Sequence, residues 1–330
     1  MSRASATPFW ASIVVAYAAF VGLRDNIGAD WEAYQAIFDY VSTISILDAL
    51  TYNDPAYSLI NWFASRANLT VHAVNVVSAA VFIISLVSFC RHQTYPILAF
   101  TISVPIVIVM IGMGYTRQAA ALGLGMIAIA RLAEGRSTSF LVWIVAAATF
   151  HQSALLLVPL VVLAADSGRL WKGLAILAFL ILVYFSWADA RFDVYATRYF
   201  GRPQNDSEGA FVRVLMSAIP ATIYLTFLRR RENDHRVRRL WTWVSIGAVS
   251  LMVAVALWPS AIIIDRFAIY FIPIQLHAYT QLMERWSLAR AFSTVYASGL
   301  ILGYGAVLWV WLSTGQHAPA WVPYHSALAF

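Results

Sequence analysis

The sequence predicts an all-α fold, a polytopic bundle of transmembrane helices. Of its 330 residues, 61% are hydrophobic and only 12% are charged, and the mean hydropathy is +0.70. Apolar runs close to the ~20 residues that a helix needs to cross a bilayer recur along the chain. A typical water-soluble domain carries about 25% charged residues. We therefore expect residues 1–330 to form a single transmembrane domain.

Nine apolar runs are predicted to cross the membrane completely. They are residues 9–23, 71–90, 96–111, 115–131, 170–187, 210–228, 241–258, 266–282 and 290–312. The first run is followed by Arg24 and Asp25 rather than by a small-residue cleavage site, so we interpret it as a retained span and not as a signal peptide. An odd number of crossings puts the two termini on opposite sides.

Residues 138–165 form a further apolar run, which we predict to be a re-entrant helical hairpin. His151 interrupts the run near its middle and Pro159 follows. Two legs of this length are too short to cross a bilayer separately. Counting the run as one crossing would instead place the arginine-rich segment 229–239 outside, against the positive-inside rule.

The hairpin gives a topology in which the inside is basic and the N-terminus is cytoplasmic. It places fourteen of the 22 cations inside, namely Arg3, Arg91, Arg131, Arg136, Arg169, Lys172, Arg229, Arg230, Arg231, Arg236, Arg238, Arg239, Arg285 and Arg290, with only five of the 16 acids. The basic segment 229–239 lies between two spans, so we interpret it as a cytoplasmic orientation signal and not as a nucleic-acid-binding patch.

The largest outer segment, residues 24–70, is predicted to hold short amphipathic helices. Trp31, Tyr34, Phe38 and Val41 recur at helical spacing behind a candidate N-cap, Asp30. A second helix is expected after Asp54 and Pro55. The loop 188–209 and the tail 313–330 belong to the same face, and the loop mixes arginines, acids and aromatic residues as sugar- and phosphate-binding loops do.

Arg117 and His151 are the candidate functional residues that the apolar surroundings single out. Each lies where hydrocarbon or its boundary is expected, and such groups usually face a protein-lined cavity. Arg117 could instead extend its head to the interface, and His151 could simply hydrogen bond within the protein. Together with Asp30, they are predicted to surround one outward-opening cavity, because all three are expected at the same depth.

Motifs of water-soluble enzymes and of metal sites are missing from the sequence. It has no phosphate-binding glycine loop, no zinc-binding His-Glu-x-x-His helix and no pair of outer acids one residue apart. Its single cysteine, Cys90, excludes a disulfide framework. We therefore expect chemistry without a metal ion or another cofactor.

Seven short motifs, taken in order, resemble those of the EpsG family of Wzy-type polysaccharide polymerases. They are Arg24–Asp25, Gly28–Tyr34, Asp54–Tyr57, Gly114–Gln118, Phe150–Ala154, Asp265–Arg266 and Trp321–Tyr324, and they extend over nearly the whole chain. The resemblance implies a multi-pass glycosyltransferase in the inner membrane of a bacterium, and the topology predicted above puts its C-terminus outside. Its substrates would be undecaprenyl-pyrophosphate-linked oligosaccharides, and a chain-length regulator would be a possible partner.

The resemblance also suggests roles for the candidate residues. The growing glycan would leave its lipid pyrophosphate for the terminal sugar of a new lipid-linked repeat unit. Arg117, Arg24 and Arg266 are candidates to hold the departing pyrophosphate, because a guanidinium matches phosphate oxygens in a planar fork. His151 or Asp30 could accept the proton of the attacking hydroxyl. Four further residues are candidates for substrate binding, namely Asp25, Tyr34, Gln118 and Asp265.

Two other classes of function remain open from the sequence. A flippase or transporter of lipid-linked glycans should show paired internal repeats and charges near the bilayer midplane, and neither is evident. A glycan ligase or acyltransferase on the outer face would use the same kind of site on another acceptor. The sugars, the linkage, and the choice among O-antigen, capsule and exopolysaccharide are not encoded in any motif that we can interpret.

Overall fold

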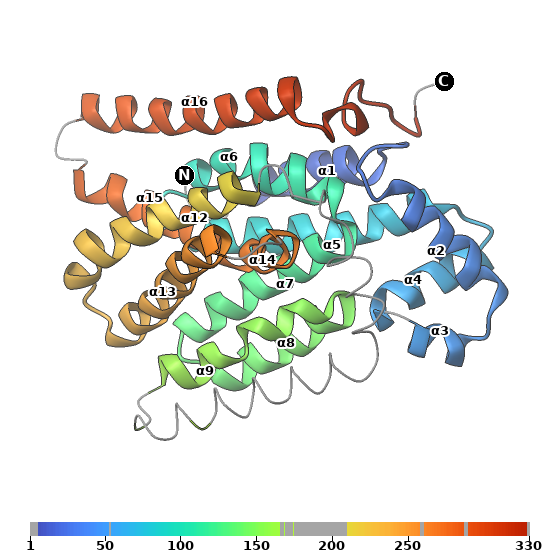
Figure 1. The fold of residues 1–330 in the computed structure, drawn as a ribbon, viewed down its shortest axis with the longest axis horizontal. Coiled ribbons are helices and arrows are strands. Elements are labelled where there is room, and N and C mark those ends of the chain that lie inside the picture. Colours follow the sequence, from blue (N-terminus) through green and yellow to red (C-terminus); the bar gives the residue numbers. More distant parts are fainter. Residues whose placement is uncertain are drawn as a thin grey trace.

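A computed structural model describes residues 6–52, 54–165, 168, 174, 210–257, 261–286 and 290–328. The predicted loop 188–209 and, apart from Leu174, the predicted span 170–187 lie outside the described residues. The described part forms a bundle of helices (Figure 1). It also contains one isolated β-bridge, between Arg24 and Ser326. The predicted all-α fold is confirmed.

Long apolar helices make up the body of the bundle (Figure 1). They are α1 (Ala6–Gly22), α5 (Val71–Arg91), α6 (Pro96–Ser103) with its π-helical continuation η1 (Val104–Gly112), α7 (Thr116–Ala133), α12 (Ala210–Ile223), α13 (His235–Leu257) and α16 (Arg290–Thr314). Four helical stretches in the described part, 71–91, 210–231, 235–256 and 292–314, are long and apolar enough to cross a membrane. This supports a membrane-spanning bundle, whereas the number of crossings stays a prediction.

Helix α7 packs closely against α5 because it carries small residues on the shared face. At Gly123 an added Cβ would lie 3.0 Å from the Ser85 Cβ and 3.1 Å from the Phe82 carbonyl oxygen. Ala119 and Ala120 of the same helix are buried. This close packing fixes α7 within the bundle and therefore fixes Arg117, which lies in its first turn.

Within the predicted re-entrant hairpin, the chain reverses its direction at His151. Helix α8 (Ser137–Phe150) ends at His151, which has extended backbone (φ −161°, ψ 120°), and the chain continues as η2 (Gln152–Leu157) and α9 (Pro159–Ala164). Ala164 lines a small pocket together with Gly135, next to the start of α8. Each leg is about 21 Å long, short of the ~30 Å hydrocarbon core. The depth of this hairpin in a membrane stays a prediction.

The predicted span 266–282 is not one continuous helix, and whether this segment crosses the membrane stays a prediction. Helix α14 (Ala261–Ala268) is followed by the 3₁₀ turn η6 (Ile269–Phe271) and then by α15 (Pro273–Trp286). Proline lacks the N–H that an uninterrupted helix needs and clashes with the carbonyl four residues earlier, so Pro273 can start a helix but not continue one. Arg266 therefore lies on a short helix and not at the start of one continuous helix.

Three short helices, α2 (Trp31–Thr43), α3 (Ile46–Tyr52) and α4 (Pro55–Arg66), form the predicted outer segment. The expected apolar face of α2 is confirmed, because Tyr34 and Val41 are buried in a separate core cluster with Trp31 and Phe38 packed against it. Asp30 and Asp54 precede α2 and α4 as expected, but neither side chain makes a capping hydrogen bond. The Asp54 carboxylate is instead paired with Arg117.

The C-terminal tail is held against the segment that follows α1. The Asp25 amide donates to the His325 carbonyl over 3.0 Å, and the Gly28 amide donates to the Ala320 carbonyl over 2.8 Å. Trp321 donates its indole N–H to the Val109 carbonyl and leaves no room for a side chain at Gly114, where an added Cβ would lie 2.8 Å from its ring. The C-terminal tail and the segment after α1 thereby meet beside the start of α7.

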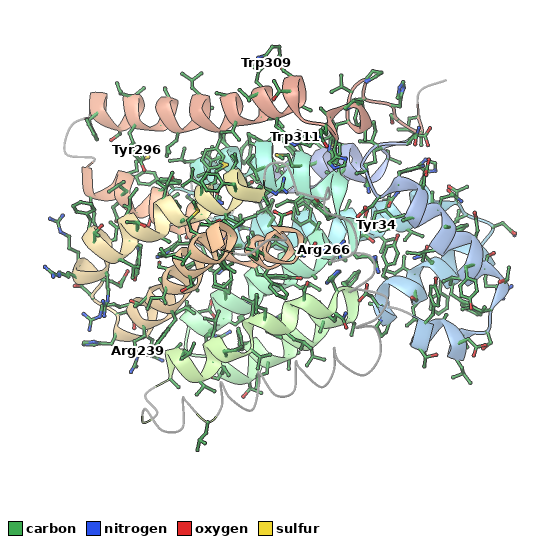
Figure 2. The ribbon with its side chains drawn as sticks, in the orientation of Figure 1. Tyr34, Arg239, Arg266, Tyr296, Trp309 and Trp311 are labelled. Carbon is green, nitrogen blue, oxygen red and sulfur yellow. The ribbon has the colours of Figure 1, made fainter. Side chains whose placement is uncertain are left out.

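The basic segment lies far from the outer helices. Figure 2 shows Arg239 at one end of the bundle and Tyr34 at the other. The predicted cytoplasmic loop 229–239 is shorter than expected, because α13 begins at His235. The charge segregation that motivated the topology is therefore also a spatial segregation, although which end faces the cytoplasm stays a prediction.

Candidate functional site

Arg117 lies at the junction of α7 with the outer helices. Its Nη1 donates to Asp54 Oδ2 over 2.7 Å, and its guanidinium carbon lies 5.8 Å from the ring centroids of both Tyr34 and Tyr57. Its Nε is buried and has no hydrogen-bond partner in the described part of the chain. Such an orphaned donor suits a site that an oxygen-rich ligand or water completes. The arginine is therefore held by one carboxylate and two aromatic faces while a donor remains unsatisfied.

His151 accepts hydrogen bonds on Nδ1. The backbone N–H of Ser153 donates to this nitrogen over 3.2 Å, and Ser153 Oγ lies 2.6 Å from it. Ser153 Oγ in turn lies 3.0 Å from the Tyr270 hydroxyl. A backbone N–H is always a donor, so Nδ1 must be the acceptor and the neutral ring carries its proton on Nε2. This form of His151 can donate a hydrogen bond to a ligand but cannot accept one.

Asp30 lies within electrostatic range of three basic residues, Arg266, Arg117 and His317. Burial nevertheless raises the pKa of its carboxyl above the ordinary value. A carboxylate with a raised pKa is a better proton acceptor than an ordinary aspartate. Arg117 and Arg266 are also the electrostatic neighbours of His151. Asp30, Arg117, His151 and Arg266 therefore belong to one region, which we call the polar cluster.

Gln118 and Arg266 are joined through the backbone. The Gln118 side-chain amide donates to the Arg266 carbonyl over 2.8 Å. The bond ties the first turn of α7 to α14, 148 residues away in the chain. Figure 2 places Arg266 toward the middle of the molecule. Gln118, which is buried, thereby positions the arginine and is not itself exposed to a ligand.

Arg24 is fully buried and lies behind the polar cluster. Its Nε donates to the Ile27 carbonyl over 3.2 Å, its Nη1 to the Val21 carbonyl over 2.6 Å and its Nη2 to Thr116 Oγ1 over 2.6 Å. All three nitrogens therefore bond within the protein. Thr116 directly precedes Arg117, so Arg24 is placed to brace the start of α7 and not to touch a pyrophosphate in this conformation.

The remaining predicted substrate-binding residues occupy three different surroundings. Asp25 lies at the surface, with its Oδ1 2.9 Å from His72 Nε2. Tyr34 is buried beneath the Arg117 guanidinium. Asp265 is also buried and accepts two hydrogen bonds of 2.7 Å from Arg213. Of these residues, Asp25 is the one whose carboxylate is open to solvent.

A large cavity of the structure is not the one that Arg117, His151 and Asp30 were predicted to share, and their common cavity stays a prediction. A cavity of about 410 Å³ lies between α16, η1 and α12, and its lining includes His317 and Arg213 but not Arg117, His151 or Asp30. The described part of the chain also holds no group of three or more His, Cys, Asp or Glu side chains placed to bind a metal ion. Metal independence stays a prediction.

A model of the EpsG family matches residues 8–326, which is nearly the whole chain. The chain belongs to the EpsG family. Membership makes it a membrane protein of the polysaccharide polymerase type and places it in polysaccharide biosynthesis. No curated protein matches the chain, and no solved structure does.

The motifs by which the sequence resembles other EpsG proteins meet in the structure. Trp321 of the last motif packs on Gly114 of the fourth. Arg24 of the first bonds Thr116, and Asp54 of the third pairs with Arg117. Motifs distributed over the whole chain thus form one layer beside the start of α7.

Three residues beside the EpsG motifs were missed as site residues by the sequence analysis. Arg213 is a charged residue within an apolar helix. The same signal singled out Arg117, but it was not applied to Arg213. Tyr270 carries no sequence signal, because a buried tyrosine is ordinary in an aromatic-rich chain. His317 lies in a tail whose position depends on distant contacts, so only the structure places it near Asp30.

Proposed function

We propose that this EpsG-family protein polymerises oligosaccharide repeat units linked to undecaprenyl pyrophosphate, at the outer face of the bacterial inner membrane. The observation that carries the proposal is the polar cluster, in which an arginine held by Asp54 and two tyrosine rings lies beside Asp30, His151 and Arg266. Such a grouping combines donors for a departing pyrophosphate with a carboxylate that can take a proton.

In the proposed reaction, a hydroxyl oxygen of the acceptor repeat attacks the anomeric carbon of the lipid-linked glycan. The bond from that carbon to the pyrophosphate oxygen breaks, and the pyrophosphate leaves on its lipid with the bonding electron pair. Asp30 takes the proton of the attacking hydroxyl, which its raised pKa favours. Arg117 and Arg266 balance the charge that develops on the pyrophosphate.

His151 has a different role in this proposal from the one that the sequence first suggested. Since its Nδ1 accepts from Ser153, its Nε2–H can donate to a pyrophosphate oxygen, which makes His151 a hydrogen-bond donor to the leaving group. Asp30 is then the base. Three positive or donor groups around the leaving group provide the charge stabilisation that a divalent metal supplies in other glycosyltransferases, consistent with metal-independent catalysis.

The other candidate residues support this arrangement. Arg24 holds the Thr116 side chain at the start of α7, Gln118 holds the backbone of α14, and Tyr34 supports the Arg117 guanidinium. Asp265 holds Arg213 beside Arg266. Asp25, whose carboxylate is exposed, is the candidate to bind a sugar hydroxyl at the rim of the site.

The test is polymerisation by the purified chain in proteoliposomes. A synthetic undecaprenyl-pyrophosphate-linked repeat unit is the only substrate, and the products are separated by size. We expect a ladder of glycans and release of undecaprenyl pyrophosphate, both unchanged by EDTA. Transfer of the lipid-linked unit across the bilayer without a ladder would indicate a flippase, whereas a single transfer to another acceptor would indicate a ligase.

A further inference from the structure

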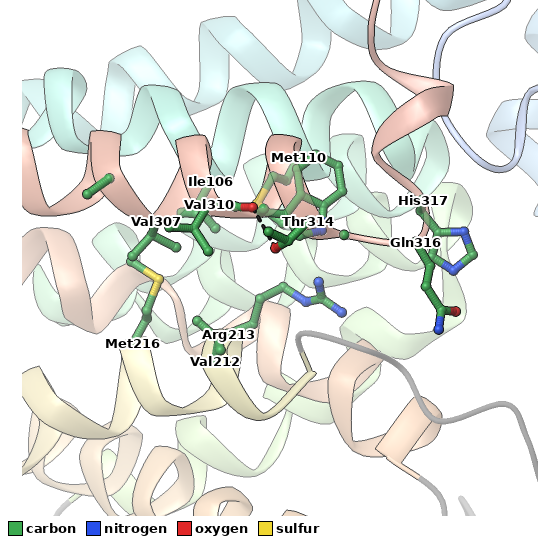
Figure 3. A pocket seen from close by; sticks show the side chains of 13 residues that line it. Ile106, Met110, Val212, Arg213, Met216, Val307, Val310, Thr314, Gln316 and His317 are labelled. Atoms are coloured by element: carbon green, nitrogen blue, oxygen red, sulfur yellow. Dashed lines mark hydrogen bonds between the residues drawn. The ribbon is translucent and has the colours of Figure 1, made fainter.

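The large cavity lies under α16, beside the polar cluster. Its volume is about 410 Å³, within the range of about 300–1,000 Å³ that is usual for ligand pockets. The apolar side chains of its walls come from three helices and include Ile106 and Met110 of η1, Val212 and Met216 of α12, and Val307 and Val310 of α16. Figure 3 shows this arrangement.

The cavity is apolar along its length and polar at one end. Its α16 wall runs from Ala306 to Thr314, about 12 Å of helix. Figure 3 shows Met216 and Val307 toward one end, with Gln316 and His317 at the other. A long apolar space with polar groups at one end has the shape of an amphiphile, a hydrocarbon chain with a polar head.

The polar end is directed toward the polar cluster. His317 is an electrostatic neighbour of Asp30, and Arg213 pairs with Asp265, the residue before Arg266. A ligand whose head reached these groups would therefore have an anionic or oxygen-rich head. Its tail would lie along α16, between that helix and α12.

The position of α16 suggests how such a tail could enter. Within residues 292–314, only 6% of the span is buried inside the protein, and Leu302 and Trp309 are each 72% exposed. Figure 1 shows α16 lying along the outside of the bundle. A helix held this loosely leaves the cavity next to the surface that would face lipid, from which a hydrocarbon chain could enter.

We propose that this cavity binds the polyprenyl chain of the lipid-linked substrate, with the carbons nearest the pyrophosphate beside Thr314 at the polar end and the chain running on toward Met216 and Val307. The proposal rests on the proposed function, because it takes the lipid from there. The head group decides between a membrane phospholipid and a polyprenyl pyrophosphate. The polar end of the cavity holds Arg213 and His317, and Arg117 and Arg266 are, like His317, electrostatic neighbours of Asp30, which favours the more highly charged pyrophosphate head.

The experiment uses the full-length chain in phospholipid nanodiscs and a polyprenyl pyrophosphate that carries a diazirine on an isoprene unit close to the head. After irradiation, labelled peptides are mapped by mass spectrometry. We expect labels on Met110 or Thr314, which lie toward the polar end of the cavity. Unlabelled polyprenyl pyrophosphate should remove them, whereas excess anionic phospholipid should not. Equal displacement by phospholipid would overturn the proposal and mark an ordinary lipid gap.

A pair of matched variants tests the same point. Ala306→Trp places a large ring in the cavity, whereas Ile301→Trp places the same ring at an exposed position on the side of α16 turned away from the lining residues. We expect Ala306→Trp to lower labelling at least tenfold and Ile301→Trp to leave it unchanged, with equal melting temperatures. Equal labelling of the two variants would contradict the proposal. Should Ala306→Trp unfold, Val310→Trp, at a lining position that is 57% exposed, takes its place.

Failure of this inference is distinguishable from failure of the proposed function. Labelling reports binding and needs no turnover. A chain that makes a glycan ladder but takes no label in the cavity would keep the polymerase and remove the lipid site. A chain that binds the probe in the cavity and makes no ladder would keep the lipid site and remove the polymerase.

Discussion

Arg117 Nη1 lies 2.7 Å from Asp54 Oδ2, although the two residues are 63 positions apart in the chain. The pair joins the first turn of α7 to the start of α4, and both side chains are mostly buried, at 24% and 9% exposure. Breaking one partner of such a pair leaves an uncompensated charge. The pair therefore fixes the Arg117 guanidinium in one orientation.

Arg117→Lys should lower polymerisation about 10²- to 10³-fold, the usual effect of removing one transition-state donor. A lysine keeps the charge but cannot bind Asp54 and a pyrophosphate oxygen in one planar fork. The measurement is the initial rate of ladder formation at matched protein levels. Arg66→Lys is the control, since Arg66 lies on the exposed side of α4 against Trp62. Near-normal polymer from Arg117→Lys would remove Arg117 from the site.

His151→Gln should retain much more activity than His151→Ala. A glutamine amide can still donate a hydrogen bond where His151 Nε2–H does, but it cannot act as a base. We expect the alanine variant to lose about 10²- to 10³-fold and the glutamine variant about tenfold. The rates of the two variants are compared at one pH. If both are equally inactive, His151 acts as a proton acceptor and its assigned tautomer is wrong.

Asp30→Asn should lower the rate about 10²- to 10⁴-fold, because an amide cannot take the proton of the acceptor hydroxyl. In the unmodified protein the rate should rise with pH as Asp30 ionises, at a pH above the ordinary 3.8, because burial raises its pKa. The measurement is a pH–rate profile from about pH 4 to pH 8. A flat profile would exclude Asp30 as the base.

The raised pKa of Asp30 also predicts that ionisation of this residue lowers the stability of the folded protein, although it raises the rate. A raised pKa means that the folded state binds the Asp30 proton more tightly than the unfolded state does, so stability is lost as pH rises through the folded pKa. Asp30→Asn should therefore raise the melting temperature at pH 7. The gain should disappear below pH 3.8, where both states hold the proton. A gain that persists in acid would show that ionisation is not its cause.

Arg24→Met should destabilise the protein more than a change of an exposed arginine does. The change leaves the Val21 and Ile27 carbonyls and the Thr116 hydroxyl without their buried donor, and each unpaired group costs about 1–3 kcal/mol. Thermal unfolding in detergent measures the difference, with Arg66→Met as the exposed control. A stable but inactive Arg24→Met variant would return Arg24 to the role of a substrate clamp.

Cysteine labelling should separate the two ends of the bundle. With Cys90 replaced by alanine, single cysteines in 24–70, 188–209 and 313–330 should react with a membrane-impermeant reagent added from outside. Cysteines in 229–239 should not react until the membrane is opened. The expectation follows from the concentration of arginine at that end. Labelling of 229–239 from outside would invert the topology and move the polar cluster to the cytoplasmic face.

Local patterns predicted the helices well where apolar residues recur at helical spacing or where a polar residue interrupts an apolar run. The apolar face of α2 follows from the spacing of Trp31, Tyr34 and Val41, and the end of α8 follows from a histidine within an apolar run. The break before α15 was missed, although Pro273 is a local signal, because the apolar run around it was interpreted as one span. Such errors lie in the interpretation and not in the information that the sequence contains.

The sequence by itself determined the class of fold and the segregation of charge, because hydrocarbon length and the positive-inside rule act on each segment separately. Only the tertiary structure decided which polar groups meet. Arg24 and Arg117 both adjoin apolar runs in the sequence, yet one braces Thr116 and the other pairs with Asp54. The proton on His151 likewise follows from Ser153 and the turn that contains it. A hydrogen-bond partner depends on where distant helices pack, which no local pattern specifies.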